Sequence, residues 1–549
     1  MPDKKTRVFM HSWHQKENDI NVIGVKEKII TEHEDGTTDI KPHLRLLKDP
    51  KRPFWVTKRQ FQNHAYKKEY EDLDKCDEYI CRDSELTIAC QRALGMYPSK
   101  FKPLPIICRS PYLYGADIST ETLVKQKYLA DAKGAHVPVT IGGLDIETEV
   151  NDQERIIAIT YIHENLIFTA CLEEFVKIYE NKQFVRNGTL KDLEDTAHQL
   201  LDPILKPNNF TFTIHISKTE VGVIKWIFDR INEYKSDYIS VWNMGYDIPY
   251  IINRLELLGI DPKTVMCAPE LPDEYKYVKW IEDKSAVAHF TDKWHWLNLA
   301  SYSQFIDTMC LYARLRKVYG RDSSYSLDAI SDKELGMHKL HFGNITNHYV
   351  AQHFDFLKYV AYNMNDVILL ILMERKNHDI ESMCGLADVT LIREYSRQQT
   401  LVKNNAYLFA KEKGKVIATV SDDMYTKYDR MLAKVGGTVL PLDKAVGLSK
   451  PILKDSESPS MFIIHVNDLD ISSSYPSVIS SMNISKETCL ATIIKINGFN
   501  AVDVEPYCTA IVNPKSHANL AVPYFFNMPT YEEMDKLYCE HRKEIGLDK

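Results

Sequence analysis

The chain has 549 residues, of which 44% are hydrophobic and 26% charged, and its formal net charge is −8. This length predicts about three domains, because a single hydrophobic core stops growing at shorter lengths. The apolar run at residues 367–373 is too short to cross a bilayer, and no secretory signal follows the polar start of the chain. The eleven cysteines show neither zinc-ligand spacing nor a disulfide framework. We therefore expect a protein of the reducing cytoplasm with no membrane partner.

The acidic balance bears on nucleic-acid binding. Proteins that bind DNA usually present a basic surface, since phosphate contacts and counterion release provide much of the affinity. A net charge of −8 gives no support to such a surface. It does not exclude a basic groove, and carboxylates that bind metals add negative charge of their own. Composition therefore leaves the function open.

The first 135 or so residues alternate short strand-like runs with turns rich in Lys and Asp. From Val137 onward, β-rich runs alternate with segments whose apolar residues recur at helical spacing, which predicts an α/β domain with a mixed sheet. The predicted strands are 137–146, 155–162, 166–170, 210–216 and 238–242, and the predicted helices are 220–234 and a long one from about His353 to Arg375. Polar, linker-like stretches lie at 187–189, 320–324 and 454–460.

Two carboxylates end the first of these predicted strands. Asp145 and Glu147 are two residues apart, so both side chains point to the same face of a strand. Two like charges this close repel each other unless a cation lies between them, and oxygen ligands favour Mg²⁺ or Mn²⁺. The alternative is a solvated strand end, which is the more common situation for an Asp-x-Glu pair considered alone.

Two further aspartates stand at informative positions. Asp247 follows the 238–242 strand where a helix begins, and considered alone it is most often a helix N-cap. Tyr362 and Asp366 are four residues apart in the long predicted helix, so they share one of its faces. A surface pair is the usual alternative, but Asp366 interrupts an otherwise apolar face.

Order and spacing together give these elements a specific meaning. Asp145-Ile146-Glu147, residues 243–247 (Asn-Met-Gly-Tyr-Asp) and residues 362–366 (Tyr-Asn-Met-Asn-Asp) follow one another in the chain. In that order they resemble the Exo I, Exo II and Exo III motifs of proofreading 3′–5′ exonucleases with a ribonuclease H-like fold. Residues 324–330 also resemble the family segment that precedes Exo III.

The resemblance implies a two-metal site that hydrolyses the phosphodiester bond at a DNA 3′ end. Two ions about 4 Å apart can activate water and stabilise the leaving oxygen. One Mg²⁺ or Mn²⁺ would be held by Asp145, Glu147 and Asp366. Asp145 would be shared between the two ions, and Asp247 would support the second. The implied residues are the metal ligands Asp145, Glu147, Asp247 and Asp366, the water-orienting Tyr362 and the DNA-contacting Asn243.

A second site is suggested further along the chain. Residues 470–477 (Asp-Ile-Ser-Ser-Ser-Tyr-Pro-Ser) follow a strand-like run and resemble motif A of family B DNA polymerases, Asp-x-x-Ser-Leu-Tyr-Pro-Ser. Residues 482–488 continue the similarity toward the tailed-phage branch of that family. The resemblance implies that Asp470 and the backbone carbonyl of Ile471 bind a metal. It also implies that Ser474 and Tyr475 line the nucleotide site, with the ring of Tyr475 packed against the deoxyribose of the incoming nucleotide.

Two weaker similarities complete this second site. Residues 531–544 resemble the first helix of the fingers subdomain, in which Arg542 aligns with an arginine that binds the nucleoside triphosphate. Residues 434–437 (Lys-Val-Gly-Gly) take the place of the family's Tyr-x-Gly-Gly motif, for which an ordinary glycine turn is the alternative. The implied nucleotide-binding residues are Ser474, Tyr475 and Arg542, and the implied DNA-binding residues are Asn243, Gly436 and Gly437.

Two family motifs have no counterpart in the sequence. They are Lys-x-x-x-Asn-Ser-x-Tyr-Gly of the fingers and Tyr-x-Asp-Thr-Asp-Ser, which carries the second palm aspartate. Two-metal phosphoryl transfer needs that second carboxylate. The leading interpretation is therefore the N-terminal part of a split family B DNA polymerase that uses dNTPs and binds primer-template DNA. A second polypeptide would supply the remaining fingers, palm and thumb.

Other interpretations stay open. A stand-alone 3′–5′ exonuclease with a vestigial palm would work without a partner. A non-catalytic DNA-binding subunit would have no need to keep four carboxylates. A truncated piece of a longer enzyme would give the same sequence as a split polymerase. A sliding clamp is a further candidate partner, and a phage-encoded protein would act in the host cytoplasm.

The expected fold class is α/β and α+β multidomain. It combines a ribonuclease H-like exonuclease domain with a mixed N-terminal domain and a partial ferredoxin-like palm. The expected domains are residues 1–137 (N-terminal), 138–379 (exonuclease), 380–440 (a return to the N-terminal domain, or a linker), 441–527 (partial palm with motif A) and 528–549 (start of the fingers).

Overall fold

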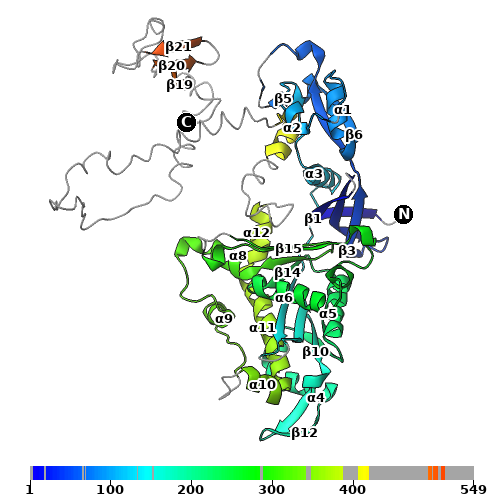
Figure 1. Ribbon diagram of the computed structural model, residues 1–549, viewed down its shortest axis with the longest axis vertical. Helices are drawn as coiled ribbons and strands as arrows, with labels where there is room; N and C mark the ends of the chain where they lie inside the picture. Colours follow the sequence, from blue (N-terminus) through cyan, green and yellow to red (C-terminus); the bar gives the residue numbers. More distant parts are fainter. Residues whose placement is uncertain are drawn as a thin grey trace, which may run out of the picture. The chain divides into compact units, whose positions relative to one another are not determined.

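The structure is a computed structural model of the chain, shown in Figure 1. It describes residues 4–17, 20–64, 67–68, 70–99, 101–132, 134–135, 137–150, 154–284, 289–341, 348–387, 406–419, 492–496, 499–504 and 508–512. The chain divides into two compact units, Met1–Val435 and Gly436–Lys549. In the second unit, the described residues form one antiparallel sheet of β19 (Thr492–Ile496), β20 (Phe499–Val504) and β21 (Cys508–Val512).

The first unit begins with an antiparallel sheet of three long strands, β1 (Lys4–Glu17), β2 (Ile20–Glu32) and β3 (Thr38–Lys48). The expectation of short runs separated by turns is therefore wrong for this region. Three charged residues of β2, Lys26, Glu27 and Lys28, are buried inside the protein. Glu27 accepts a hydrogen bond from Tyr128 Oη at 2.5 Å, and Lys28 Nζ lies 2.6 Å from Asp237 Oδ2.

A second group of strands and short helices follows the first sheet. β4 lies between β6 and β7, and β5 pairs with β18, which comes from a distant part of the chain. The bounds are β4 (Lys51–Thr57), β5 (Tyr70–Asp72), β6 (Cys76–Arg82), β7 (Leu113–Tyr114), β18 (Lys415–Ile417), α1 (Leu86–Ala93), α2 (Leu104–Ile107) and α3 (Thr120–Ala132). Residues 406–412 form a further helical segment just before β18.

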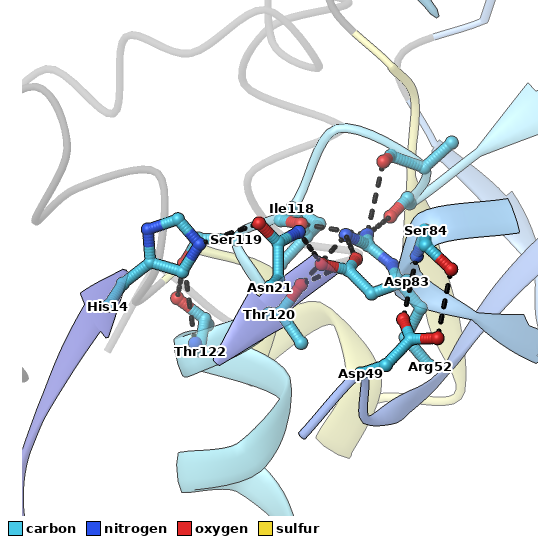
Figure 2. A network of polar contacts seen from close by, with 12 residues as sticks. His14, Asn21, Asp49, Arg52, Asp83, Ser84, Ile118, Ser119, Thr120 and Thr122 are labelled. Atoms are coloured by element: carbon cyan, nitrogen blue, oxygen red, sulfur yellow. Dashed lines mark hydrogen bonds and ion pairs between the residues drawn. The ribbon is translucent and has the colours of Figure 1, made fainter. Parts of the chain in front are cut away.

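A buried polar network ties this group to the first sheet (Figure 2). The guanidinium of Arg52 on β4 donates to three carbonyls of the loop 115–118 at 2.7 to 3.3 Å and to Asp83 Oδ1 at 3.2 Å. The amide of Asn21 on β2 donates to the other oxygen of Asp83. Arg52 and Asp83 are only 4% and 8% exposed, so the ion pair depends on these hydrogen bonds to offset its desolvation.

The central sheet has six strands in the order β13-β10-β9-β8-β14-β17. β8, β9 and β10 form an antiparallel meander, while β14 and β17 run parallel to β8 and β13 runs parallel to β10. If the edge strand β13 is left out of the numbering, the five strands β10-β9-β8-β14-β17 lie in the order 3-2-1-4-5, which is consistent with the expected ribonuclease H-like fold. The bounds are β8 (Ile141–Thr148), β9 (Ile156–His163), β10 (Leu166–Leu172), β13 (Thr211–Ser217), β14 (Tyr238–Val241) and β17 (Gln304–Asp307).

Helices cover the central sheet on both faces. Every residue of β9 from Ile156 to Ile162 is buried, as expected for a strand with both faces covered. α5 and α11 both pack against β9. The helices of this domain are α4 (Leu190–Leu205), α5 (Glu220–Tyr234), α6 (Met244–Leu257), α7 (Pro262–Met266), α8 (Thr308–Leu315), α9 (Leu327–Leu335), α10 (His348–Phe354), α11 (Phe356–Asn377) and α12 (Asp379–Ala387).

Hairpins and short 3₁₀ turns complete the described elements. The hairpins are β11 (Lys177–Glu180) with β12 (Gln183–Asn187) and β15 (Val278–Ile281) with β16 (Trp296–Leu299). The 3₁₀ turns are η1 (Arg59–Phe61), η2 (Leu73–Lys75), η3 (Asp83–Glu85), η4 (Glu173–Phe175), η5 (Asp273–Tyr275), η6 (Phe290–Asp292) and η7 (Lys317–Tyr319).

Three predicted boundaries differ from the structure. The first strand begins at Ile141 rather than at residue 137, and Pro138 in that run has no N–H to donate to a neighbouring strand. The long helix predicted from His353 begins at Phe356 as α11, because Asp355 separates it from α10. The predicted linker at 187–189 ends β12 and caps α4, where Thr189 and Asp192 form a capping box.

α11 is long and apolar enough to cross a membrane, and it is the one such helix in the described part of the chain. Within its most apolar window, 78% is buried inside the protein. It packs against β8, β9 and α4. The helix therefore belongs to the core, and its length spans the sheet that carries the candidate site.

Candidate active site

β8 supplies the first two carboxylates. Asp145 and Glu147 are half-buried near the carboxyl end of the strand, while Ile146 between them is buried in the apolar core. This alternation places both carboxylates on one face, as their spacing predicts. The solvated strand end, which was the alternative for this pair, does not describe the site.

α11 supplies the opposite wall. Tyr359, Tyr362, Asn363 and Asp366 recur at spacings of three and four, so they lie on one face of the helix. Asn363 Nδ2 donates to Asp145 Oδ2 at 2.7 Å, and Tyr359 Oη donates to Glu147 Oε2 at 2.5 Å. Tyr362 is 9% exposed and Asp366 2%, so the surface-pair alternative is wrong.

The structure brings three carboxylates together. One oxygen each of Asp145, Glu147 and Asp366 lies within 4.8 Å of the others. Burial, together with the charge of Asp366, raises the pKa of Asp145 to about 7, and burial together with the charge of Asp145 raises the pKa of Glu147 well above its usual value. Burial also raises the pKa of Asp366, to about 6. These carboxylates are costly to ionise together, which is the electrostatic condition of a cation site.

Asp247 lies beside this cluster, in the first turn of α6, and is 4% exposed. Its pKa is raised well above the usual value by burial and by the charges of Asp145 and Glu147. It is not one of the three carboxylates that converge within 4.8 Å. The N-cap of α6 is Asn243, so the N-cap alternative for Asp247 is wrong.

The turn before α6 is held by the neighbouring strand. Asn243 is exposed and has a left-handed backbone with φ 62°, a conformation that asparagine tolerates better than most residues. Asp307, at the end of β17, accepts a hydrogen bond from Met244 N at 3.0 Å and from Cys310 N at 3.0 Å. One buried carboxylate thus fixes the starts of both α6 and α8.

The sequence motifs do not include Lys339, although its ammonium lies in the site. Lys339 Nζ donates to Asp366 Oδ2 at 2.6 Å and to Tyr362 Oη at 3.1 Å. Burial lowers the pKa of Lys339, but its interactions with Asp366, Tyr362 and Asp145 together raise it by more, so the pKa is raised overall. One signal pointed toward this loop, since Asp328 of the 324–330 segment accepts a hydrogen bond from Lys339 N at 2.9 Å.

The predicted polymerase residues are not described by the structure. Their roles stay predictions, as do the expected domain boundaries. Gly436, Gly437, Asp470, Ile471, Ser474, Tyr475 and Arg542 all lie outside the described residues.

Comparison with known proteins relates one segment of the chain to a protein family. Residues 116–330 match the exonuclease domain of DNA polymerase family B. The matched segment includes Asp145, Glu147 and Asp247 and ends before Tyr362 and Asp366. The tertiary structure supplies what that segment lacks, because α11 brings Asp366 into the cluster of Asp145 and Glu147.

Two polymerases are similar to the chain over part of their length. The DNA-directed DNA polymerase of Escherichia phage RB69 is 23% identical over 328 residues, which cover 57% of this chain and 31% of that polymerase. DNA polymerase 1 of Saccharolobus solfataricus is 22% identical over 280 residues, which cover 49% of this chain and 27% of that polymerase. The chain thus spans less than a third of either relative.

The residues of the site fit a divalent cation. Exonuclease domains of this family use divalent metals, and three carboxylates with oxygens within 4.8 Å supply the hard ligands that Mg²⁺ or Mn²⁺ prefers. Among the described residues, Asp366 Oδ1 is buried and has no hydrogen-bond partner. A cation bound there would polarise a phosphodiester and lower the pKa of a bound water.

Proposed function

We propose that the chain is a proofreading 3′–5′ exonuclease that hydrolyses the last phosphodiester bond of a DNA strand with two divalent cations, Mg²⁺ or Mn²⁺. The observation that carries the proposal is the convergence of Asp145, Glu147 and Asp366 within 4.8 Å. The match of residues 116–330 to the family B exonuclease domain supports the substrate class.

Each residue of the site has a role in this proposal. Asp145, Glu147 and Asp366 hold one cation, and Asp145 with Asp247 supports the second. Tyr362 is buried against Lys339, where its hydroxyl is fixed at 3.1 Å from the ammonium and can orient a water. The exposed Asn243 begins α6, and a helix N-terminus favours a phosphate group, so this end of α6 suits the DNA terminus.

Substitution of the β8 carboxylates tests the proposal. Asp145→Ala with Glu147→Ala is expected to reduce Mg²⁺-dependent shortening of a 3′-terminal DNA primer by at least about 1,000-fold, because two ligands of the same cation are lost. The measurement is the single-turnover rate of trimming of an end-labelled primer.

A matched control keeps the same change in charge. Asp229→Ala with Glu233→Ala removes two exposed carboxylates from α5, 46% and 52% exposed, and should leave trimming within about twofold of the wild-type rate. Normal trimming by the β8 double variant would place the hydrolytic site elsewhere.

We further propose that Asp470 and the carbonyl of Ile471 bind a metal in a DNA polymerase site. Support comes from the resemblance of residues 470–477 to motif A and from the two polymerases that the chain resembles. Ser474, Tyr475 and Arg542 would surround the incoming dNTP, and Gly436 with Gly437 would contact the template. The second palm carboxylate has no counterpart in the 549 residues, so a further polypeptide region would supply it.

A reconstitution experiment separates this proposal from its alternatives. Asp470→Ala should abolish primer extension by the chain combined with a polypeptide that carries the missing palm motif, while trimming persists. Extension by the wild-type 549-residue chain alone would contradict a shared site. Trimming without any extension in the combined sample would favour a stand-alone exonuclease, and neither activity would favour a DNA-binding subunit.

A further inference from the structure

The Glu147 carboxylate is held by a residue that no sequence motif contains. Tyr359 on α11 is 2% exposed, and its hydroxyl donates to Glu147 Oε2 at 2.5 Å. The two residues are 212 positions apart in the chain, and the bond links the helix directly to the ligand face of β8. A tyrosine that donates to a carboxylate oxygen restricts both the rotation of the carboxylate and the direction of its free lone pairs.

Gln352 of α10 determines which way the Tyr359 hydroxyl points. Gln352 is fully buried, and its Nε2 donates to Tyr359 Oη at 3.1 Å. Because a tyrosine hydroxyl has one proton, accepting from Gln352 leaves that proton to be donated elsewhere. His348 Nδ1 is 3.5 Å from the hydroxyl, whereas Glu147 Oε2 is 2.5 Å away, so the carboxylate is the better acceptor.

The same glutamine also holds the backbone of the strand that carries Glu147. Gln352 Nε2 donates to Thr148 O at 2.6 Å, and Gln352 Oε1 accepts from Val150 N at 3.0 Å. Both ends of the buried amide are therefore used next to the carboxyl end of β8. The side chain of Glu147 and the backbone that follows it are fixed by one connected set of hydrogen bonds.

From this geometry we propose that Tyr359 is a positioning residue for Glu147, oriented by Gln352, and that the pair sets how tightly Glu147 binds the divalent cation. The inference rests on the proposed function, since it concerns the cation of the exonuclease site. Partners of metal ligands typically change metal affinity by about 10- to 100-fold when they are removed. Asn363, one turn further along α11, likewise positions Asp145, because its Nδ2 donates to Asp145 Oδ2 at 2.7 Å.

The test measures Mn²⁺ binding to the full 549-residue chain without DNA. The electron paramagnetic resonance signal of free Mn²⁺ reports how much of the ion remains unbound. Tyr359→Phe keeps the buried ring and removes the hydroxyl, and it should weaken Mn²⁺ binding by roughly 10-fold or more. Gln352→Met keeps a similar volume and should weaken binding several-fold. Saturating Mn²⁺ should restore trimming by Tyr359→Phe, because the ligand is displaced but still present.

A matched variant removes the same kind of hydrogen bond elsewhere. Tyr312 on α8 is 2% exposed, and its hydroxyl donates to Glu334 Oε1 at 2.5 Å. Tyr312→Phe should lower thermal stability about as much as Tyr359→Phe while leaving Mn²⁺ affinity unchanged. Equal weakening of Mn²⁺ binding by both variants would overturn the inference, since it would show a general effect of stability.

Glu147→Gln separates failure of the inference from failure of the proposed function. If Tyr359 acts through Glu147, adding Tyr359→Phe to Glu147→Gln should weaken Mn²⁺ binding no further. Wild-type binding by Tyr359→Phe, alongside weak binding by Glu147→Gln, would overturn the inference alone. Equal binding by the wild type and Glu147→Gln would overturn the proposed site and the inference together.

Discussion

Lys339 places an ammonium among carboxylates whose pKa values are raised by burial. Its Nζ lies 2.6 Å from Asp366 Oδ2, and its positive charge opposes the rise in the pKa of both Asp366 and Asp145. In the absence of a bound cation, this ammonium offsets part of the repulsion within the cluster. The Lys339 ammonium also occupies Asp366 Oδ2, so it competes with a metal ion for the negative charge of that carboxylate.

We expect Lys339→Met to separate these two effects. Without DNA or metal, the variant should be less stable than the wild type by roughly 2 to 4 kcal/mol, because a buried carboxylate loses its paired charge. Mn²⁺ should raise its Tm by more than it raises the wild-type Tm, since the competing ammonium is gone. Thermal denaturation with and without Mn²⁺ measures both.

The control for this prediction is a lysine in a solvent-exposed pair. Lys333 is 50% exposed and pairs with Asp322, so Lys333→Met should change stability by less than about 1 kcal/mol. An identical Mn²⁺ response in Lys339→Met and the wild type would show that Lys339 does not compete with the cation.

At the scale of elements, the site depends on the close approach of α11 to β8. A Cβ added at Gly143 would lie 2.8 Å from Val367 Cγ1 and 3.4 Å from Ile371 Cδ1. A Cβ at Gly142 would meet the Ile162 carbonyl oxygen at 2.6 Å. The two glycines therefore let the helix and the neighbouring strand pack against β8, just before the strand reaches its carboxylates.

We expect Gly143→Ala to displace α11 and the ligand next to Val367. Stability should fall by roughly 1 to 3 kcal/mol, the usual result of overpacking a core. Mn²⁺ binding should weaken as well, because Asp366 directly precedes Val367 on the helix. Unfolding in urea and Mn²⁺ titration are the two measurements.

Val367→Ala provides the matching test of this contact. In the Gly143→Ala background it should restore part of the stability and of the Mn²⁺ affinity, because it removes the clashing methyl groups. Strictly additive losses in the double variant would mean that the two positions do not interact.

The predicted elements agree with the structure where local periodicity decides them. The helix predicted at 220–234 has the bounds of α5, Glu220–Tyr234, and the strand predicted at 166–170 lies within β10. Predictions fail where a distant partner decides the element. Short runs with turns were expected in the N-terminal region, but β2 is a long strand in which Lys28 and Glu27 are paired with Asp237 and Tyr128. No local pattern reveals a partner that comes from another part of the chain.

At the scale of the first unit, buried charges join the N-terminal sheet to the central sheet. Lys28 Nζ lies 2.6 Å from Asp237 Oδ2, and Tyr302 Oη donates to Asp237 Oδ1 at 2.7 Å. Lys26, two residues away on the same face of β2, is 3% exposed. Burial lowers the pKa of Lys26 to about 7, against the attraction of Asp237. The contact between the N-terminal sheet and the central sheet is therefore sensitive to pH.

The direction of the pH effect follows from the proton on Lys26. Its folded pKa of about 7 lies below that of an unfolded lysine, so between pH 7 and about 10 the unfolded chain binds a proton that the folded chain does not. The contribution of Lys26 to stability is full above about pH 10, and it is lost progressively as the pH falls from there through 7. His11, whose pKa is lowered by burial and by Lys26, adds a loss at lower pH.

We expect Lys26→Met to be more stable than the wild type at pH 6, by roughly 2 to 4 kcal/mol, with the difference disappearing toward pH 10. Lys28→Met should behave oppositely and destabilise across this range, because it leaves the buried Asp237 without its ion pair. Thermal denaturation from pH 6 to 10 checks both. A pH-independent difference for Lys26→Met would show that Lys26 keeps an ordinary pKa.

The sequence by itself determined the carboxylates and their order. Asp145 with Glu147, and Tyr362 with Asp366, could be predicted because spacings of two on a strand and four on a helix place side chains on one face. Only the tertiary structure decided that these faces meet, and that Lys339, Tyr359 and Gln352 hold them. Their hydrogen bonds to the site join residues up to 212 positions apart, and no local periodicity records a contact that packing alone creates.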